Sequence, residues 1–233
     1  MKNEKIEQFK LSLKTAFPHT LPVLTGFLVL GMAYGVLMQT KGYSAIWAVL
    51  MSAIAFCGSM QFVAITLLTT AFDPFQAFFL SLMVNARHIF YGLAMLDKYK
   101  GLGKVKNFLI YTLCDETFSI TSSVNPPENC DLKSFYFCIS FLDYIYWIGG
   151  TLLGSILGTF IAFNTAGLDF ALTALFVVLF IEQIRIKENR IAGCIGLGCT
   201  LLSLFLFGGN NLVIPAMGFI LTLLLVRRKI ICH

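Results

Sequence analysis

Residues 44–71 read SAIWAVLMSAIAFCGSMQFVAITLLTTA and contain no Asp, Glu, Lys or Arg. About 20 apolar residues are enough for one helix to cross the hydrocarbon core of a bilayer. The stretch is therefore long for a single crossing, and a glycine at Gly58 interrupts it near the middle. We predict a membrane segment that either breaks into half-helices or enters the bilayer and returns.

The rest of the chain has the same character. Of its 233 residues, 58% are hydrophobic and only 12% are charged, a balance that a soluble domain with a polar surface does not show. We predict an all-α fold, a polytopic transmembrane bundle of about seven to eight hydrophobic segments with broken or re-entrant helices among them. The apolar segments are 21–38, 44–71, 74–96, 108–123, 134–163, 168–183, 191–207 and 212–226.

The length leaves room for a single transmembrane domain over residues 1–233. Within it we expect a basic amphipathic N-terminal segment at 1–19, the membrane bundle at 20–227 and a short basic tail at 228–233. Two small-residue faces predict close helix packing: Gly31 with Gly35, and Gly150 with Gly154 and Gly158.

The net charge of +5 does not indicate a nucleic-acid partner. Lys and Arg cluster where apolar runs end, at 98–106, 185–190 and 227–229, as in cytoplasmic loops. We therefore expect a multi-pass protein of the cytoplasmic (inner) membrane with both termini cytoplasmic. The seven cysteines form no CxxC pair, so we expect neither a metal site nor any cofactor.

The basic loops give a test of the membrane topology. Three apolar segments separate the N-terminus from loop 98–106, and three more separate that loop from 185–190, so simple crossings would place successive basic loops on opposite sides. One broken or re-entrant segment in each group of three removes the conflict. The candidates are 44–71, interrupted at Cys57-Gly58-Ser59, and 134–163, interrupted at Gly149-Gly150; the alternative is that one loop violates the charge rule.

Ionisable residues lie at membrane depth in three segments: Arg87 and His88 in the third, Asp115 and Glu116 in the fourth, and Asp143 in the fifth. Each such charge costs about 2.5–3.5 kcal/mol at a helix centre, so these side chains must pair, face water or bind a ligand. An ion pair of Arg87 with one of the carboxylates that only locks two helices together is the structural alternative.

Polar residues recur at helical spacing in the fourth and fifth segments, which predicts two facing stripes and a polar pathway between them. The stripes are Thr112, Asp115, Glu116, Ser119 and Ser123, and Tyr136, Ser140, Asp143, Trp147 and Thr151. A break at Gly58 would also free backbone N–H groups near Gln61 for a substrate carboxylate, although Gln61 is nearly as well explained by a hydrogen bond to a neighbouring helix.

Three blocks in order carry a resemblance to a known family: 56–62 (FCGSMQF), 85–91 (NARHIFY) and 115–118 (DETF). Together they make the chain resemble the AzlC/YgaZ family, the large subunits of bacterial branched-chain amino acid exporters, over nearly its whole length. The resemblance implies export of valine, leucine, isoleucine or methionine. It also implies a small hydrophobic membrane partner of the AzlD/YgaH kind; coupling to an ion gradient is our expectation, and a higher oligomer is compatible with it.

The resemblance and the residues together give a hypothesis for the site. Substrate-binding candidates are Gly58, Ser59, Gln61, Asn85, Arg87, Asp115 and Glu116, and proton-coupling candidates are His88, Glu116 and Asp143. Arg87 would hold the substrate carboxylate, and Asp115 or Glu116 its ammonium. We expect no enzyme, with two alternatives kept open: a passive channel for a small polar solute, and an intramembrane hydrolase that uses Ser59 and His88.

Overall fold

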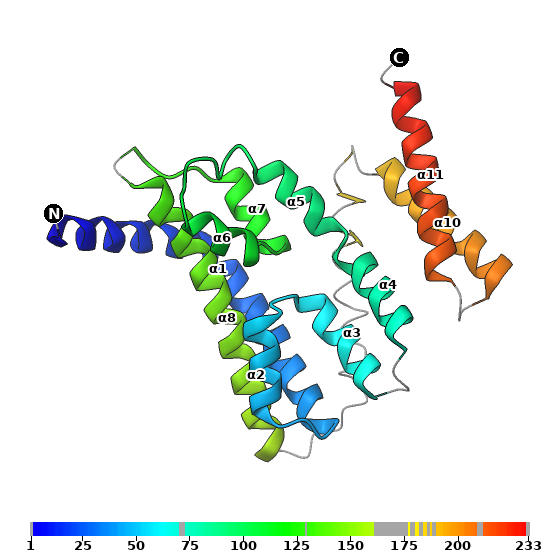
Figure 1. The fold of residues 1–233 in the computed structure, drawn as a ribbon, viewed down its shortest axis with the longest axis horizontal. Helices are drawn as coiled ribbons and strands as arrows, with labels where there is room; N and C mark the ends of the chain where they lie inside the picture. Colours follow the sequence, from blue (N-terminus) through cyan, green and yellow to red (C-terminus); the bar gives the residue numbers. More distant parts are fainter. Residues whose placement is uncertain are drawn as a thin grey trace. The chain divides into compact units, whose positions relative to one another are not determined.

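A computed structural model describes residues 2–69, 73–128, 130–160, 190–208 and 212–231, together with 177, 180, 181, 184, 185 and 187. Every regular element in this described part is helical, and no strand occurs in it (Figure 1). The chain divides into two compact units, Met1–Leu172 and Thr173–His233, which we take separately. The all-α prediction is confirmed.

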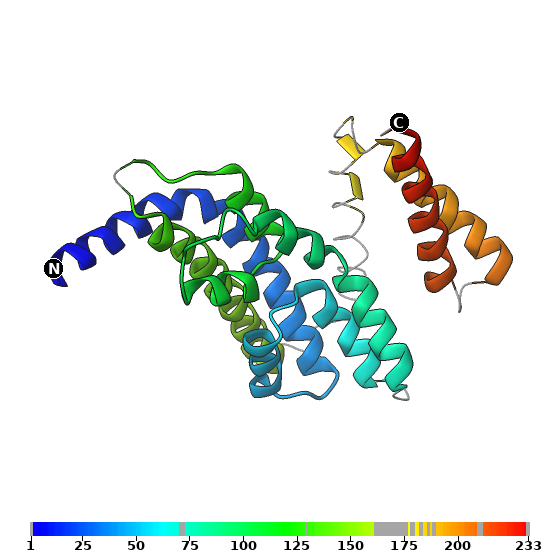
Figure 2. The same ribbon diagram turned by 45° about the horizontal axis from the view of Figure 1, so that its top comes forward.

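Two long helices form the centre of the packing in the first unit. They are α1 (Lys2–Thr40) and α8 (Leu132–Phe160), which lie side by side in Figures 1 and 2. The predicted glycine faces meet between them. A Cβ on Gly35 would overlap the carbonyl oxygen of Thr151, and one on Gly154 would overlap the carbonyl oxygen of Met32. Only glycine permits such close approach of two helix backbones.

Helix α8 begins at a capping residue. The carboxylate of Asp131 accepts hydrogen bonds from the hydroxyl of Ser134 at 2.7 Å and from its backbone N–H at 2.9 Å. These bonds stabilise the ionised form and lower the pKa of Asp131 below its usual value.

One of the two predicted interruptions is wrong. Helix α8 continues without a break through Gly149 and Gly150. A glycine in a helix interior costs about 1 kcal/mol relative to alanine, but here Gly150 lies against α1, where an added Cβ would be 2.7 Å from the carbonyl oxygen of Phe27. The packing on α1 keeps the helix continuous, so this glycine marks close packing.

The other predicted interruption is confirmed. Segment 44–71 is two helices, α2 (Ala45–Ile54) and α3 (Gly58–Thr69), separated by three residues. Phe56 in the break has a φ of 41°, a left-handed conformation that is unusual for an aromatic residue. The break is therefore defined by backbone geometry as well as by sequence.

Two further segments that the hydropathy pattern shows as continuous are also broken. Segment 74–96 forms α4 (Pro74–Asn85) and α5 (Arg87–Met95), with a 41° bend between Ala77–Asn85 and Arg87–Met95. Segment 108–123 forms the end of α6 (Val105–Tyr111) and α7 (Asp115–Ser123). Neither break contains a glycine or proline, so no residue in the sequence marks it.

The second unit contains the helix pair α10 (Arg190–Phe207) and α11 (Val213–Ile231), packed together with the rings of Phe207 and Phe219 6.5 Å apart. Predicted segment 168–183 lies almost entirely outside the described residues.

Three described helices are long and apolar enough to cross a membrane, within Ile6–Thr40, Leu132–Phe160 and Arg190–Phe207, and the bent pair α4–α5 would make a fourth. Many large apolar side chains are also exposed, including Ile46, Phe75, Phe90, Leu153 and Phe205. Lipid is the environment in which such a surface is stable.

Candidate functional site

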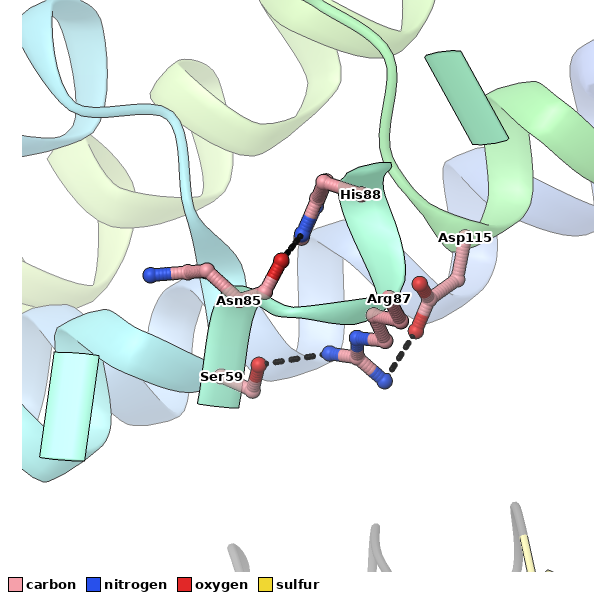
Figure 3. Close-up of polar contacts among 5 residues, drawn as sticks. All are labelled: Ser59, Asn85, Arg87, His88 and Asp115. Carbon is pink, nitrogen blue, oxygen red and sulfur yellow. Dashed lines mark hydrogen bonds and ion pairs between the residues drawn. The ribbon is translucent and has the colours of Figure 1, made fainter. Parts of the chain in front are cut away.

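The three helix breaks of the first unit meet at one guanidinium group (Figure 3). Arg87, the first residue of α5, donates from Nη2 to the hydroxyl of Ser59 at 2.7 Å. Its Nη1 lies 2.6 Å from Oδ2 of Asp115, the first residue of α7. Because Ser59 is the second residue of α3, Arg87 connects the starts of three half-helices.

The junction brings one positive and one negative side chain together at helix starts. Helix N-termini carry partial positive charge, and Arg87 adds a full one at the start of α5. Asp115 supplies the compensating charge. The side chains of Arg87 and Asp115 are 30% and 20% exposed, so the pair can be reached from outside the protein. Within the described residues, Nε of Arg87 is buried without a hydrogen-bond partner.

Four other predicted site residues lie next to the three breaks, in the first or last turn of a helix. Gly58 begins α3, and Asn85 ends α4. Nδ1 of His88 lies 3.2 Å from the carbonyl oxygen of Asn85, whose side chain extends away from Arg87 in Figure 3. Glu116 follows Asp115 in the first turn of α7. The structure thus places these four residues in the first or last turn of a helix.

Asp143 is fully buried on α8 and accepts a hydrogen bond from the hydroxyl of Thr117 at 2.7 Å. Thr117 lies on α7, two residues after Asp115, so one turn of helix connects the Asp143 carboxylate to the Arg87 junction. Sequence reasoning missed Thr117, because it falls between the residues of the predicted stripe.

The two predicted stripes have different outcomes. The fifth-segment stripe is one inward face of α8, and all five of its side chains are buried. The fourth-segment stripe is wrong as a single face, because α6 ends at Tyr111 and Thr112 lies in the break before α7. The helical spacing used in the prediction does not hold across a broken helix.

Gln61 belongs to a separate buried network between α2, α3 and α8. Its carbonyl oxygen accepts from the indole N–H of Trp147 at 2.8 Å, and its amide donates to Ser52 at 2.9 Å. The hydroxyls of Ser52 and Thr151 lie 2.8 Å apart. Since Gln61 is fully buried and both ends of its amide are engaged, this arrangement matches the structural alternative for Gln61.

We expect Q61M to destabilise the protein, because it leaves the Trp147 indole N–H buried without a partner, while the Ser52 hydroxyl keeps its contact with Thr151. A buried group without a partner costs about 1–3 kcal/mol, which corresponds to a fall of several degrees in the melting temperature. Thermal unfolding of the purified protein measures this. The same substitution at exposed Gln8 on α1 is the control and should change stability by less than about 0.5 kcal/mol. Equal melting of Q61M and wild type would contradict this role.

The break between α2 and α3 leaves backbone carbonyl groups at the end of α2 without helical hydrogen bonds, and tyrosine hydroxyls donate to them. The hydroxyl of Tyr111 lies 2.5 Å from the carbonyl oxygen of Ala53 and 2.7 Å from that of Ile54, and Tyr144 donates to Ala53 at 2.8 Å. Freed backbone groups at membrane depth need such partners. Tyr111 and Tyr144 therefore stabilise the end of α2, a role that the sequence did not reveal.

A cavity of about 430 Å³ lies beside the same three breaks. It falls within the range of about 300–1,000 Å³ that small-molecule sites occupy. Its polar lining includes two predicted site residues, Asn85 and His88. The residues lining it are Ala55, Phe56, Cys57, Met60, Ser81, Asn85, His88, Gly92, Ile110, Tyr111 and Leu113.

The hydrolase alternative gains no support from the geometry. The Ser59 hydroxyl accepts a hydrogen bond from Arg87, and Nδ1 of His88 faces the carbonyl oxygen of Asn85. No hydrogen bond joins Ser59 to His88, both of which lie in the described part of the chain. A nucleophile and its base require that contact.

Comparison with known proteins gives the family. The AzlC protein family model matches residues 22–161. A branched-chain amino acid transport protein, AzlC, of Bacillus subtilis is 50% identical over 97% of this chain and 89% of its own length. An uncharacterized membrane protein of Helicobacter pylori is 38% identical over 97% and 100%, and the inner membrane protein YgaZ of Escherichia coli is 25% identical over 73% and 72%.

No solved structure matches the chain significantly. The Bacillus relative is named a transport protein, in agreement with the prediction that the chain is not an enzyme, and relatives are named membrane proteins. The family match covers the helix breaks and the Arg87 junction. This membrane protein belongs to the AzlC family.

Proposed function

We propose that the chain is the large subunit of an exporter for branched-chain amino acids, namely valine, leucine, isoleucine and also methionine. The observation that carries the proposal is the accessible Arg87–Asp115 pair at the meeting point of three broken helices. Helix breaks at membrane depth occur where the backbone lines a cavity, and transporters use them to bind substrate. The Bacillus relative is named a branched-chain amino acid transport protein, which supports amino acid transport.

A free amino acid is a zwitterion, and the Arg87–Asp115 pair offers one partner for each of its charges. The substrate carboxylate binds the guanidinium of Arg87, and the ammonium binds Asp115, with Glu116 beside it. One protein ion pair is then exchanged for two protein–substrate pairs, and the net charge of the site is unchanged. Ser59, already 2.7 Å from the guanidinium, keeps Arg87 oriented during this exchange.

Coupling to an ion gradient is assigned to Asp143, Glu116 and His88. The Asp143 side chain is the least exposed of the three. It is fully buried and accepts a hydrogen bond from Thr117. Proton movement at this carboxylate would act on α7, whose first residue holds the substrate ammonium. The connection runs through one helix turn, from Thr117 to Asp115.

The rest of the assembly is also part of the proposal. The transporter lies in the cytoplasmic membrane with both termini cytoplasmic, because the basic clusters follow the pattern of cytoplasmic loops. A small hydrophobic subunit of the AzlD/YgaH kind completes it. The many exposed apolar side chains of the described helices leave surface for both this partner and lipid.

Efflux from vesicles tests the proposal. Vesicles containing the chain, with and without the small subunit, are loaded with labelled leucine, valine or methionine, and efflux is followed with and without a protonophore. We expect saturable efflux that needs both subunits and collapses with the protonophore. Efflux that rises linearly with concentration would indicate a passive channel, and no efflux of any of these amino acids would contradict the substrate assignment.

A further inference from the structure

We propose that the 430 Å³ cavity receives the aliphatic side chain of the substrate, and that Gly92 keeps it open. This inference rests on the proposed function and adds a specificity-determining residue to it. The ligand class is an α-amino acid with a branched or unbranched aliphatic side chain. Nothing in the sequence distinguishes Gly92 from the other glycines of the chain.

The position of the cavity connects it to the Arg87 junction. Its lining includes residues on both sides of Arg87 in the chain, Asn85 and His88. It also includes Cys57 and Met60, on both sides of Ser59. The cavity and the Arg87 junction thus share the breaks of α2–α3 and α4–α5, although Arg87, Ser59 and Asp115 are not among the residues that line the cavity. In the proposal, the charged end of the ligand binds Arg87 and its side chain enters this neighbouring cavity.

The chemistry of the lining fits an aliphatic group. Phe56, Met60, Ile110 and Leu113 give it apolar walls drawn from the breaks of α2–α3 and α6–α7. Phe56 holds its place there in a left-handed conformation, with φ at 41°. Strained backbone of this kind persists only where surrounding structure holds it, and it is concentrated at functional sites.

Gly92 is the glycine of the lining, and its surroundings are open. A Cβ added to it would have no heavy atom within 4 Å, so a larger side chain can be built there without displacing backbone. Such a side chain would occupy cavity volume that the substrate otherwise uses. The size of residue 92 should therefore set the largest substrate that fits.

Cys57 provides a readout that does not depend on transport, because it is one of the residues that line the cavity. The wild-type complex is treated with N-ethylmaleimide, with and without leucine, and modification of each cysteine is followed by peptide mass spectrometry. At about ten times Kd, leucine should slow the modification of Cys57 about tenfold. Cys194 on α10 is exposed and serves as the internal control, with an unchanged rate.

A substitution series tests the role of Gly92 in selectivity. From G92A to G92V and G92L, leucine export should fall relative to alanine export, by about tenfold or more for G92L. G149L is the matched control, at a helical glycine that also has open space around its Cβ position but lies outside the cavity lining, and it should leave the ratio unchanged.

The outcomes separate this inference from the proposed function. If the complex exports leucine but leucine leaves the modification of Cys57 unchanged, the cavity is not the side-chain site and the transport function stands. An unchanged leucine-to-alanine ratio in a folded G92L protein also overturns the inference. If the wild-type complex neither binds nor exports leucine, both proposals fail.

Discussion

R87A should abolish leucine transport while the protein still inserts into the membrane. Arg87 holds Ser59 and Asp115 at 2.7 and 2.6 Å, and its removal takes away the only cation of this junction among the described residues. Loss of one partner of a hydrogen-bonded charge pair costs about 2 kcal/mol or more where the pair is partly buried, so the apparent affinity for leucine should fall about 30-fold or more. Efflux of labelled leucine from vesicles measures this.

The double variant R87A/D115A separates substrate binding from helix locking. R87A alone leaves Asp115 without its partner, which itself destabilises the protein. Removing both charges restores neutrality, so the double variant should melt closer to wild type than R87A does. Transport should remain absent in both. Recovery of transport in the double variant would show that the pair only locks the helices together.

G154A should lower the stability of the whole first unit. The added methyl group would overlap the backbone of Met32 on α1, where no flexible side chain can move aside. Overpacking of this kind costs about 1–3 kcal/mol or more, and a fall of about 5 °C in the melting temperature is expected. Fluorescence-detected size-exclusion chromatography after heating provides the measurement.

The matched control lies five residues earlier on the same helix. A Cβ at Gly149 would have no heavy atom within 4 Å, so G149A adds a better helix former without a clash. It should melt at or slightly above the wild-type temperature. If G154A and G149A behave alike, α1 and α8 do not pack as closely as described.

Much of the fold could be predicted from the sequence because hydropathy and glycine carry strong physical signals. The uncharged run 44–71 is long for a single membrane crossing, and its glycine coincides with the observed break. The two glycines at 149–150 gave the opposite result, because close packing on α1 also requires glycine. Glycine alone does not distinguish a broken helix from a tightly packed one.

The breaks at Ala86 and at residues 112–114 could not be predicted, because they contain no residue that disfavours helix on its own. They depend on long-range contacts such as the bonds from Arg87 to Ser59 and Asp115. The charges at 87 and 115 were correctly singled out, since an ionisable residue at membrane depth needs a partner. The roles of Thr117, Tyr111 and Gly92 became visible only once the helices were placed.

The central claim is that Arg87 recognises the substrate carboxylate at the junction of three broken helices. Binding of leucine and of leucinol, which lacks the carboxylate, to the purified complex tests it most directly in wild type and in R87A/D115A. We predict that wild type strongly prefers leucine and that the double variant does not distinguish the two ligands. A double variant that keeps the wild-type preference would contradict the claim.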